Sequence, residues 1–241
     1  MDRYAIIVAG GSGSRMGGDL PKQFMLLEGK PVVLHTIERF LLLPFPVEIV
    51  LILPSAYREY WKDYCFENNL RFKHTLVSGG ITRFHSVKNA LKYIPRGAVV
   101  AVHDGVRPFI AESFLERLFT LGEEVGAVVP AVKPVDSIRM KCAQDIEKDT
   151  TDSTEYVQVD REQYLLVQTP QVFRSDILLD AYEQAFIPSF TDDASVVEKM
   201  GCKISITDGL RHNIKLTQTE DMVLAEAIMP LTRNGRDLSG S

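Results

Sequence analysis

A glycine-rich stretch near the amino terminus has the composition of a phosphate-binding loop. It reads AGGSGSRMGG over residues 9–18 and directly follows the short apolar run 4–8. Glycines let backbone N–H groups approach phosphate oxygens closely. Arg15 and Lys22 add a planar guanidinium fork and a movable point charge for the same oxygens. The stretch therefore predicts a nucleotide phosphate site at the end of the first strand.

Two familiar nucleotide loops do not fit this stretch. The dinucleotide pattern G-x-G-x-x-G requires a glycine where Met16 stands. The P-loop requires Gly-Lys followed by Ser or Thr, and no such step occurs. A third pattern fits, Gly-Gly-x-Gly-x-Arg-Met followed by Pro21-Lys22. A plain glycine turn beside a surface lysine is the alternative interpretation.

Further polar blocks follow later apolar runs. They are SGGITRFHS over 78–86, VHDGVRPF over 102–109, QTPQ over 168–171, and TDDAS over 191–195 with NIK at 213–215. Ligands of open α/β sheets bind outside the carboxyl ends of the strands, so Asp104 is a candidate ligand-binding carboxylate. A strand-end capping carboxylate is its alternative role. His103 is expected to be a packed core histidine rather than a base.

Apolar runs alternate with amphipathic segments of helical length. The expected strands are Tyr4–Val8, Val47–Leu53, Val99–Val102, Ala127–Ala131, Tyr156–Val159 and Tyr164–Val167. The expected helices are Val32–Leu42, Tyr57–Asn68, Ser86–Tyr93, Phe114–Glu123, Ser175–Phe186, Asp193–Met200 and Thr219–Ile228. This alternation predicts an α/β fold, an open and mostly parallel Rossmann-like sheet with helices on both faces.

The alternation lapses between about 133 and 167, where the sequence is polar and mixed. A segment of this kind is expected to protrude from the sheet, with a loop at 145–154. We expect residues 1–233 to form a single domain and the small, polar residues 234–241 to be a disordered tail.

Composition limits the function classes. The chain is 45% hydrophobic and 24% charged with a net charge of -5, which is typical of a globular protein and does not favour a general nucleic-acid binder. Its three dispersed cysteines indicate reduced thiols rather than a disulfide framework or a zinc site. The apolar runs are too short to span a bilayer. We therefore expect a cytoplasmic protein with no membrane or nucleic-acid partner.

Taken together, the blocks resemble the nucleotidyltransferases that activate phosphorylated sugars. The closest resemblance is to the 2-C-methyl-D-erythritol 4-phosphate cytidylyltransferase family of the non-mevalonate isoprenoid pathway. It runs from about Tyr4 to Ile228 and rests on the glycine stretch with PKQ at 21–23 and on the four later blocks, in the family's order. The resemblance implies transfer of CMP from CTP to a polyol phosphate with release of pyrophosphate. It also implies Mg²⁺ and a homodimer built through the protruding arm.

The resemblance implies roles for individual residues. As catalytic groups it implies Arg15, Lys22, Arg161 and Lys215. For CTP it implies Ala9, Gly10, Gly11, Gly13, Gly80, Arg83, Ser86 and Asp104, the last also as the candidate metal ligand. For the second substrate it implies Asp104, Arg107, Ser137, Arg161, Thr169, Thr191 and Lys215.

Two positions depart from the family pattern, and two other functions compete with this one. Ile81 stands where the family often has a small or acidic residue, and Ser137 stands where threonine is usual. A ribitol-5-phosphate cytidylyltransferase would share most blocks, but TDDAS and the Val-Asp-Arg at 159–161 favour methylerythritol phosphate. A non-catalytic nucleotide-binding module is disfavoured because Arg15, Lys22 and Lys215 are all present.

Overall fold

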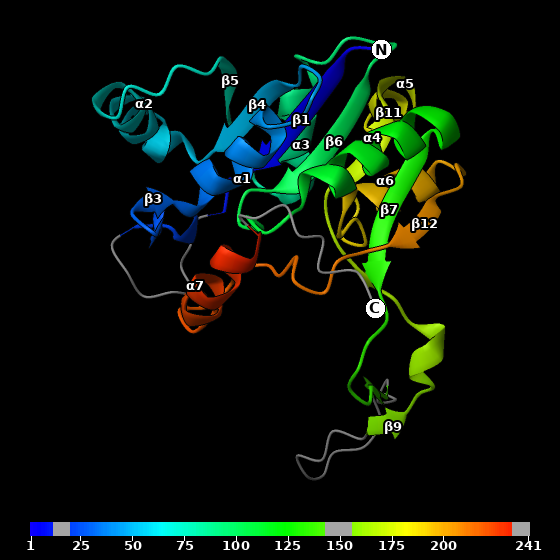
Figure 1. The fold of residues 1–241 in the computed structure, drawn as a ribbon. Coiled ribbons are helices and arrows are strands. Elements are labelled where there is room, and N and C mark those ends of the chain that lie inside the picture. Colours follow the sequence, from blue (N-terminus) through cyan, green and yellow to red (C-terminus); the bar gives the residue numbers. More distant parts are fainter. Residues whose placement is uncertain (12–19, 143–155, 233–241) are drawn as a thin grey trace, which may run out of the picture.

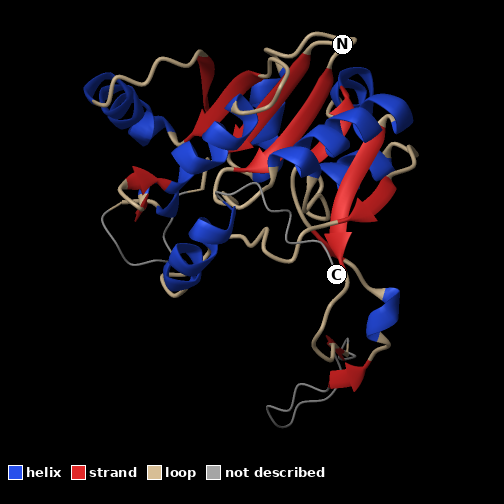
Figure 2. Cartoon of the chain, in the orientation of Figure 1, coloured by secondary structure: helices blue, strands red, loops and turns tan. Residues whose placement is uncertain are grey.

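A mixed eight-stranded sheet forms the centre of the molecule (Figures 1 and 2). The computed structural model describes residues 1–11, 20–142 and 156–232. In spatial order the strands are β5 (His74–Ser78), β4 (Glu48–Leu53), β1 (Arg3–Val8), β6 (Val99–Asp104), β11 (Gln171–Arg174) and β7 (Ala127–Val132), with β10 (Leu166–Val167) and β12 (Ser205–Asp208) also paired to β7. Strands β5, β4, β1 and β6 are mutually parallel, whereas β11 is antiparallel to β6 and β7. The predicted open, mostly parallel sheet is confirmed.

Helices cover both faces of this sheet because alternate strand residues point to opposite sides. Ala5 and Ile7 of β1 face a cluster with α1 (Val32–Leu41), α2 (Arg58–Glu67) and α4 (Glu112–Val125). Ile6 faces a second cluster with α3 (Arg83–Leu91), α5 (Ser175–Ala181) and α6 (Asp193–Lys199). The central strands β4, β6 and β7 are buried on both faces, which explains why they appear in the sequence as continuous apolar runs.

Helix boundaries follow local capping chemistry. Helix α6 begins as predicted after Asp192, whose side chain accepts from the Ser195 backbone N–H in a capping box, and it closes at Gly201 with φ +91. Helix α3 begins at Arg83, earlier than predicted, because Thr82 caps it by accepting from the His85 backbone N–H.

The predicted strands omit three short ones outside the central sheet, Leu26–Leu27, Lys30–Pro31 and Arg139–Lys141, and within the sheet they omit β11, β5 and β12. Of these, β5 and β12 are edge strands with partly exposed residues, so neither carries a continuous apolar run. They are held by parallel pairing to β4 and β7 respectively. Such pairing depends on a neighbour far away in the sequence, which periodicity alone does not reveal.

The chain order reverses beside β1. From β1 the chain proceeds to β4 and then β5 on one side, whereas β6 lies on the other side. This is a topological switch point, where the loops after neighbouring parallel strands separate and leave room for a ligand. The residues that directly follow β1, β5 and β6 all lie at this edge.

The segment after β7 leaves the sheet and projects from the main body (Figure 1). It contains the antiparallel pair β8 (Arg139–Lys141) and β9 (Tyr156–Gln158) and a short 3-10 helix, η3 (Arg161–Gln163). Strand β10 then rejoins β7. The predicted loop 145–154 and tail 234–241 lie outside the described residues.

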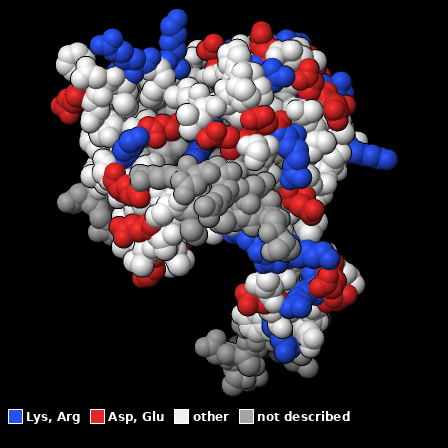
Figure 3. Space-filling view, in the orientation of Figure 1, with Lys and Arg blue, Asp and Glu red and all other residues white. Residues whose placement is uncertain are grey.

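A third, smaller cluster supports the ligand-binding edge of the sheet. Helix α7 (Asp221–Thr232) packs Ala225 and Met229 against Leu27, Val106 and their neighbours. Leu27 belongs to a hairpin of β2 (Leu26–Leu27) and β3 (Lys30–Pro31). On the face drawn in Figure 3, the lysines and arginines of the described residues alternate with acidic residues rather than forming one basic surface. Within the described ranges no helix is long and apolar enough to cross a membrane.

Candidate active site

A cavity of about 470 Å³ opens at the topological switch point. It is lined by residues at the ends of β1 and β6, by Lys22 and Gln23, by the start of α3 and the turn before it, and by Lys215 in a later loop. Its lining residues are Val8, Ala9, Gly10, Gly11, Lys22, Gln23, Gly80, Ile81, Thr82, Arg83, Ser86, Asp104, Val106 and Lys215. Most residues expected to bind CTP therefore meet in one cavity although they come from distant parts of the sequence.

Gln23 holds the first part of the glycine stretch in place. Its side chain is buried, and its amide nitrogen donates to the carbonyls of Ala9 at 2.9 Å and Gly11 at 3.2 Å. Lys22 begins the 3-10 helix η1 (Lys22–Phe24), which the buried ring of Phe24 anchors to the core. These contacts hold the Lys22 backbone at the cavity wall. Sequence reasoning missed the role of Gln23, although its place directly after Lys22 was a signal.

The turn from β5 into α3 forms the opposite wall. The Gly80 backbone N–H donates to Ser86 Oγ at 2.9 Å, and that hydroxyl donates to the Thr82 carbonyl at 2.9 Å. A Cβ at Gly80 would lie 2.5 Å from His85 Cβ, so only glycine fits. The Ile81 side chain is 96% exposed at the rim.

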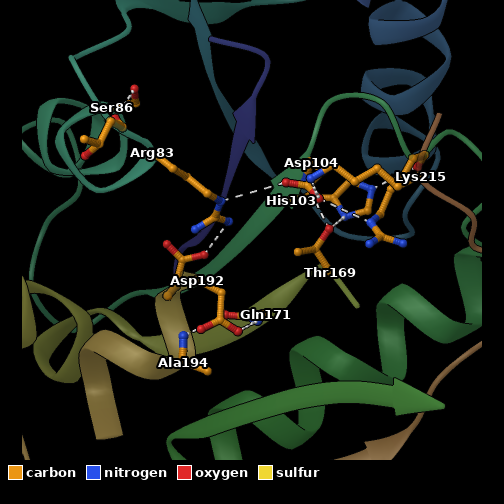
Figure 4. A network of polar contacts seen from close by, with 12 residues as sticks. Arg83, Ser86, His103, Asp104, Thr169, Gln171, Asp192, Ala194 and Lys215 are labelled. Atoms are coloured by element: carbon orange, nitrogen blue, oxygen red, sulfur yellow. Dashed lines mark hydrogen bonds and ion pairs between the residues drawn. The ribbon is translucent and has the colours of Figure 1, made fainter. Parts of the chain in front are cut away.

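Asp104 is a buried carboxylate on the floor of the cavity and lies close to three cations, of which Arg83 and Lys215 also line the cavity (Figure 4) and Arg107 does not. Lys215 Nζ lies 3.0 Å and Arg107 Nε 3.3 Å from Asp104 Oδ2. Arg83 Nε lies 3.9 Å from Asp104 Oδ1. Burial by itself raises the pKa of Asp104, but these cations outweigh it and hold the pKa well below its usual range. The carboxylate is therefore ionised, and the cations outnumber it where an anionic substrate would enter.

Loops after the strands position these cations. The Leu216 backbone N–H donates to the Val106 carbonyl at 3.0 Å, and the buried Leu216 side chain anchors the loop that carries Lys215. Arg107 Nη1 donates to the Asn213 carbonyl at 2.7 Å. The NIK block at 213–215 is thereby joined to the loop after β6.

His103 and Thr169 lie behind Asp104 in a buried chain of hydrogen bonds. The Asp104 backbone N–H donates to Thr169 Oγ1 at 3.1 Å, which directs the hydroxyl hydrogen to His103 Nδ1 at 3.0 Å. His103 Nε2 is then the donor to the Arg107 carbonyl at 3.0 Å. Burial lowers the pKa of His103 to about 4, so the ring is neutral. His103 is thus a packed histidine, in agreement with the expectation from its sequence context.

Several residues implied by the resemblance do not line this cavity. Thr169 is buried, and its hydroxyl is occupied by the hydrogen bonds behind Asp104. Thr191 is exposed beside the cap of α6. Ser137 and Arg161 are exposed on the segment that projects away, where Arg161 donates to the Val135 carbonyl. Arg15 and Gly13 lie outside the described residues.

The side chains at the cavity floor could hold a divalent cation only if a bound substrate supplied further ligands. Within residues 1–11, 20–142 and 156–232, no three His, Cys, Asp or Glu side chains cluster as a metal site. Mg²⁺ commonly takes one or two carboxylate oxygens and completes its shell with substrate phosphates and water. Asp104 can supply one such oxygen, so the residues fit a magnesium ion that arrives with a triphosphate.

Comparison with known proteins identifies the family to which this chain belongs. The sequence model of the IspD family, 2-C-methyl-D-erythritol 4-phosphate cytidylyltransferase, matches residues 4–231. The chain belongs to the IspD family. The match spans every residue that lines the cavity and the whole projecting segment.

Individual IspD proteins agree with this assignment. The 2-C-methyl-D-erythritol 4-phosphate cytidylyltransferase of Phocaeicola vulgatus is 43% identical over 229 residues, covering 95% of this chain and 100% of the relative. The one from Bacteroides thetaiotaomicron is 44% identical with the same coverage. Among solved structures, 4-diphosphocytidyl-2C-methyl-D-erythritol synthase from Anaerococcus prevotii aligns with a TM-score of 0.76 at 26% identity, covering 95% of this chain and 96% of the other. IspD membership therefore rests on both sequence and fold.

Proposed function

We propose that this chain transfers CMP from CTP to 2-C-methyl-D-erythritol 4-phosphate and releases pyrophosphate. The observation that carries the proposal is the cation-lined cavity at the switch point, in a chain of the IspD family. Relatives of 42–44% identity bear the name of this activity. The reaction belongs to the synthesis of isoprenoid precursors.

The chemistry requires positioned positive charge more than a protein nucleophile. A phosphate oxygen of the sugar alcohol attacks the α-phosphorus of CTP and forms a new P–O bond. The bond from that phosphorus to pyrophosphate breaks in line, and pyrophosphate carries away the electron pair. Both reactants are anions, so Lys22 and Lys215 would lower their repulsion and stabilise charge on the phosphoryl oxygens. Bound Mg²⁺ would neutralise further phosphate charge beside Asp104.

The walls of the cavity suit a nucleotide. Gly10 and Gly11 line the cavity directly after β1, where glycines allow backbone N–H groups to approach phosphate oxygens, and the Gly80–Ser86 turn, which also lines the cavity, would receive the base. Arg15, which the resemblance assigns to the α-phosphate, belongs to the same stretch and stays a prediction.

We also propose a homodimer in which the projecting segment of one chain completes the cavity of the other. Its support is an unusual exposure of apolar side chains on that segment, namely Val135, Met140, Tyr156, Tyr164, Leu165 and Leu166. Exposed apolar surface of this kind marks an interaction site. Ser137 and Arg161 lie on the same segment, so a partner chain would receive them.

The activity is tested by measuring pyrophosphate release with CTP, Mg²⁺ and 2-C-methyl-D-erythritol 4-phosphate. Ribitol 5-phosphate serves as the competing substrate. Lys22→Ala should reduce the rate on the order of a hundredfold or more. Lys199→Ala, which removes an exposed lysine of α6, should not change it. Preferential turnover of ribitol 5-phosphate would overturn the choice of substrate.

A further inference from the structure

Arg83 is shared between two carboxylates, only one of which lines the cavity. Its Nη2 donates to Asp193 Oδ2 at 2.6 Å, while its Nε lies 3.9 Å from Asp104 Oδ1. Asp193 is fully buried and does not line the cavity. The short, shielded contact is therefore the one to Asp193. The long one is the contact to Asp104, which Figure 4 marks between the two labelled residues.

The Asp193 carboxylate is fixed by a second buried contact. Tyr182 donates its hydroxyl to Asp193 Oδ1 at 2.6 Å. Burial, and then the negative charge of Asp193, raise the pKa of Tyr182 well above its ordinary value, so the phenol stays protonated and remains a donor. Each oxygen of Asp193 thus has its own partner, one from α3 and one from the residue that ends α5.

The first turn of α6 is also clamped to the sheet. Gln171 of β11 donates to Asp192 Oδ2 at 2.7 Å and accepts from the Ala194 backbone N–H at 2.8 Å. These two contacts flank Asp193 on either side, so its position is set by β11 as well as by Tyr182. The TDDAS and QTPQ blocks of the sequence meet here.

The two oxygens of Asp104 differ as a result. Oδ2 receives the contacts from Lys215 at 3.0 Å and Arg107 at 3.3 Å. Arg83 approaches Oδ1 only to 3.9 Å, which is beyond hydrogen-bond length. Without Asp193, Asp104 would be the remaining carboxylate beside the Arg83 side chain, which is 25% exposed, and the guanidinium would cover Oδ1.

We propose that Asp193 is a positioning residue that holds Arg83 away from Asp104 Oδ1. That oxygen then stays open to an electropositive group of the bound nucleotide complex, either a ribose hydroxyl or a magnesium ion. The inference rests on the proposed function in that the ligand is CTP. It assigns a task to a buried acidic residue that does not line the cavity.

The test is CTP binding by titration calorimetry, without the second substrate and both with and without Mg²⁺. Asp193→Asn keeps the side-chain shape but removes the charge that holds Arg83. The affinity of this variant for CTP should fall at least about tenfold, because the partly buried Arg83 guanidinium, left without its close partner, turns to the remaining carboxylate. Glu198→Gln makes the same acid-to-amide change at an exposed position of α6 and should bind CTP normally. A loss confined to the titration with Mg²⁺ assigns Oδ1 to the metal, and a loss in both titrations assigns it to a hydroxyl.

A double variant separates positioning from folding. If Asp193 acts through Arg83, adding Asp193→Asn to Arg83→Gln should not weaken CTP binding further. The double variant removes both charges of the buried pair, so it should fold even where Asp193→Asn alone does not. Additive losses, or unchanged affinity in Asp193→Asn, would overturn the proposal. Because binding is measured without methylerythritol phosphate, a lack of turnover in the unaltered chain counts only against the proposed function.

Discussion

Lys215 lines the cavity beside the Asp104 carboxylate. Its ammonium lies 3.0 Å from Asp104 Oδ2 and its side chain is 41% exposed, so under the proposed function it can contact both that carboxylate and an entering phosphate. Replacing it by alanine removes a positioned donor from the transition state and frees Asp104 to repel the anionic substrates. Lys215→Ala should lower kcat/KM on the order of a hundred- to thousandfold, measured by pyrophosphate release. Lys203→Ala, in a loop beside β12, is the matched control, and equal activity of the two variants would contradict the role of Lys215.

At the scale of elements, the turn between β5 and α3 depends on a single glycine. A Cβ at Gly80 would lie 2.5 Å from His85 Cβ and 2.8 Å from the His85 carbonyl carbon, so the backbone of α3 would have to move. Gly80→Ala should lower the free energy of unfolding by about 1–3 kcal/mol, measured by urea denaturation. Gly11→Ala is the matched comparison because its Cβ would meet nothing within 4 Å. Equal stability of the two variants would show that the turn relaxes freely.

Helix α2 is attached to β5 through a histidine that must stay neutral. The indole N–H of Trp61 donates to His74 Nε2 at 2.9 Å, and burial lowers the pKa of His74. Protonation of His74 at Nε2 would place a new N–H against the indole N–H of Trp61. The pKa of His74 in the native protein lies below its unfolded value of about 6.5. The contact with Trp61 therefore stabilises the native state fully above about pH 6.5. This stabilisation is lost as the pH falls through the native pKa.

Tryptophan fluorescence measures this loss directly, because Trp61 is the single tryptophan of the chain. Acidification should shift its emission in the unaltered protein before global unfolding. In His74→Gln the group that titrates is gone, so the shift should disappear. A shift of the same midpoint in both proteins would assign the pH dependence to another group.

At the scale of the whole molecule, the proposed dimer predicts that two variants, each nearly inactive alone, regain activity when they are mixed. Lys215→Ala alters the cavity and Arg161→Ala alters the projecting segment, so each homodimer should be nearly inactive. Mixing the two under conditions of subunit exchange should restore about a quarter of the normal rate, since half of the dimers are mixed and each has one intact site. Activity that stays absent after mixing, with exchange shown by mass spectrometry, would place both residues in the same chain's site.

Much of the fold could be predicted from the sequence. Buried parallel strands produce continuous apolar runs and helices produce spaced ones, so β1, β4, β6, β7 and the helices were predicted within a few residues, whereas the antiparallel central strand β11 was not. The cap of α6 was predicted for the same reason, since Asp192 and Gly201 act on their immediate neighbours. The blocks at 78–86 and 213–215 were recognised as binding elements without knowledge of where they meet.

Tertiary structure decided what local chemistry leaves open. The edge strands β5 and β12 exist because distant strands pair with them. Asp193 is a buried partner of Arg83 only because α6 and α3 pack on the same face of the sheet. Thr169 appeared in the sequence as a substrate-binding group, yet its hydroxyl is used behind Asp104. The sequence by itself determined the fold class, the family and the types of residue at the site, because these follow from local patterns. Long-range contacts in the folded chain decide which of those residues form ion pairs. They also decide which are buried behind the residues that line the cavity.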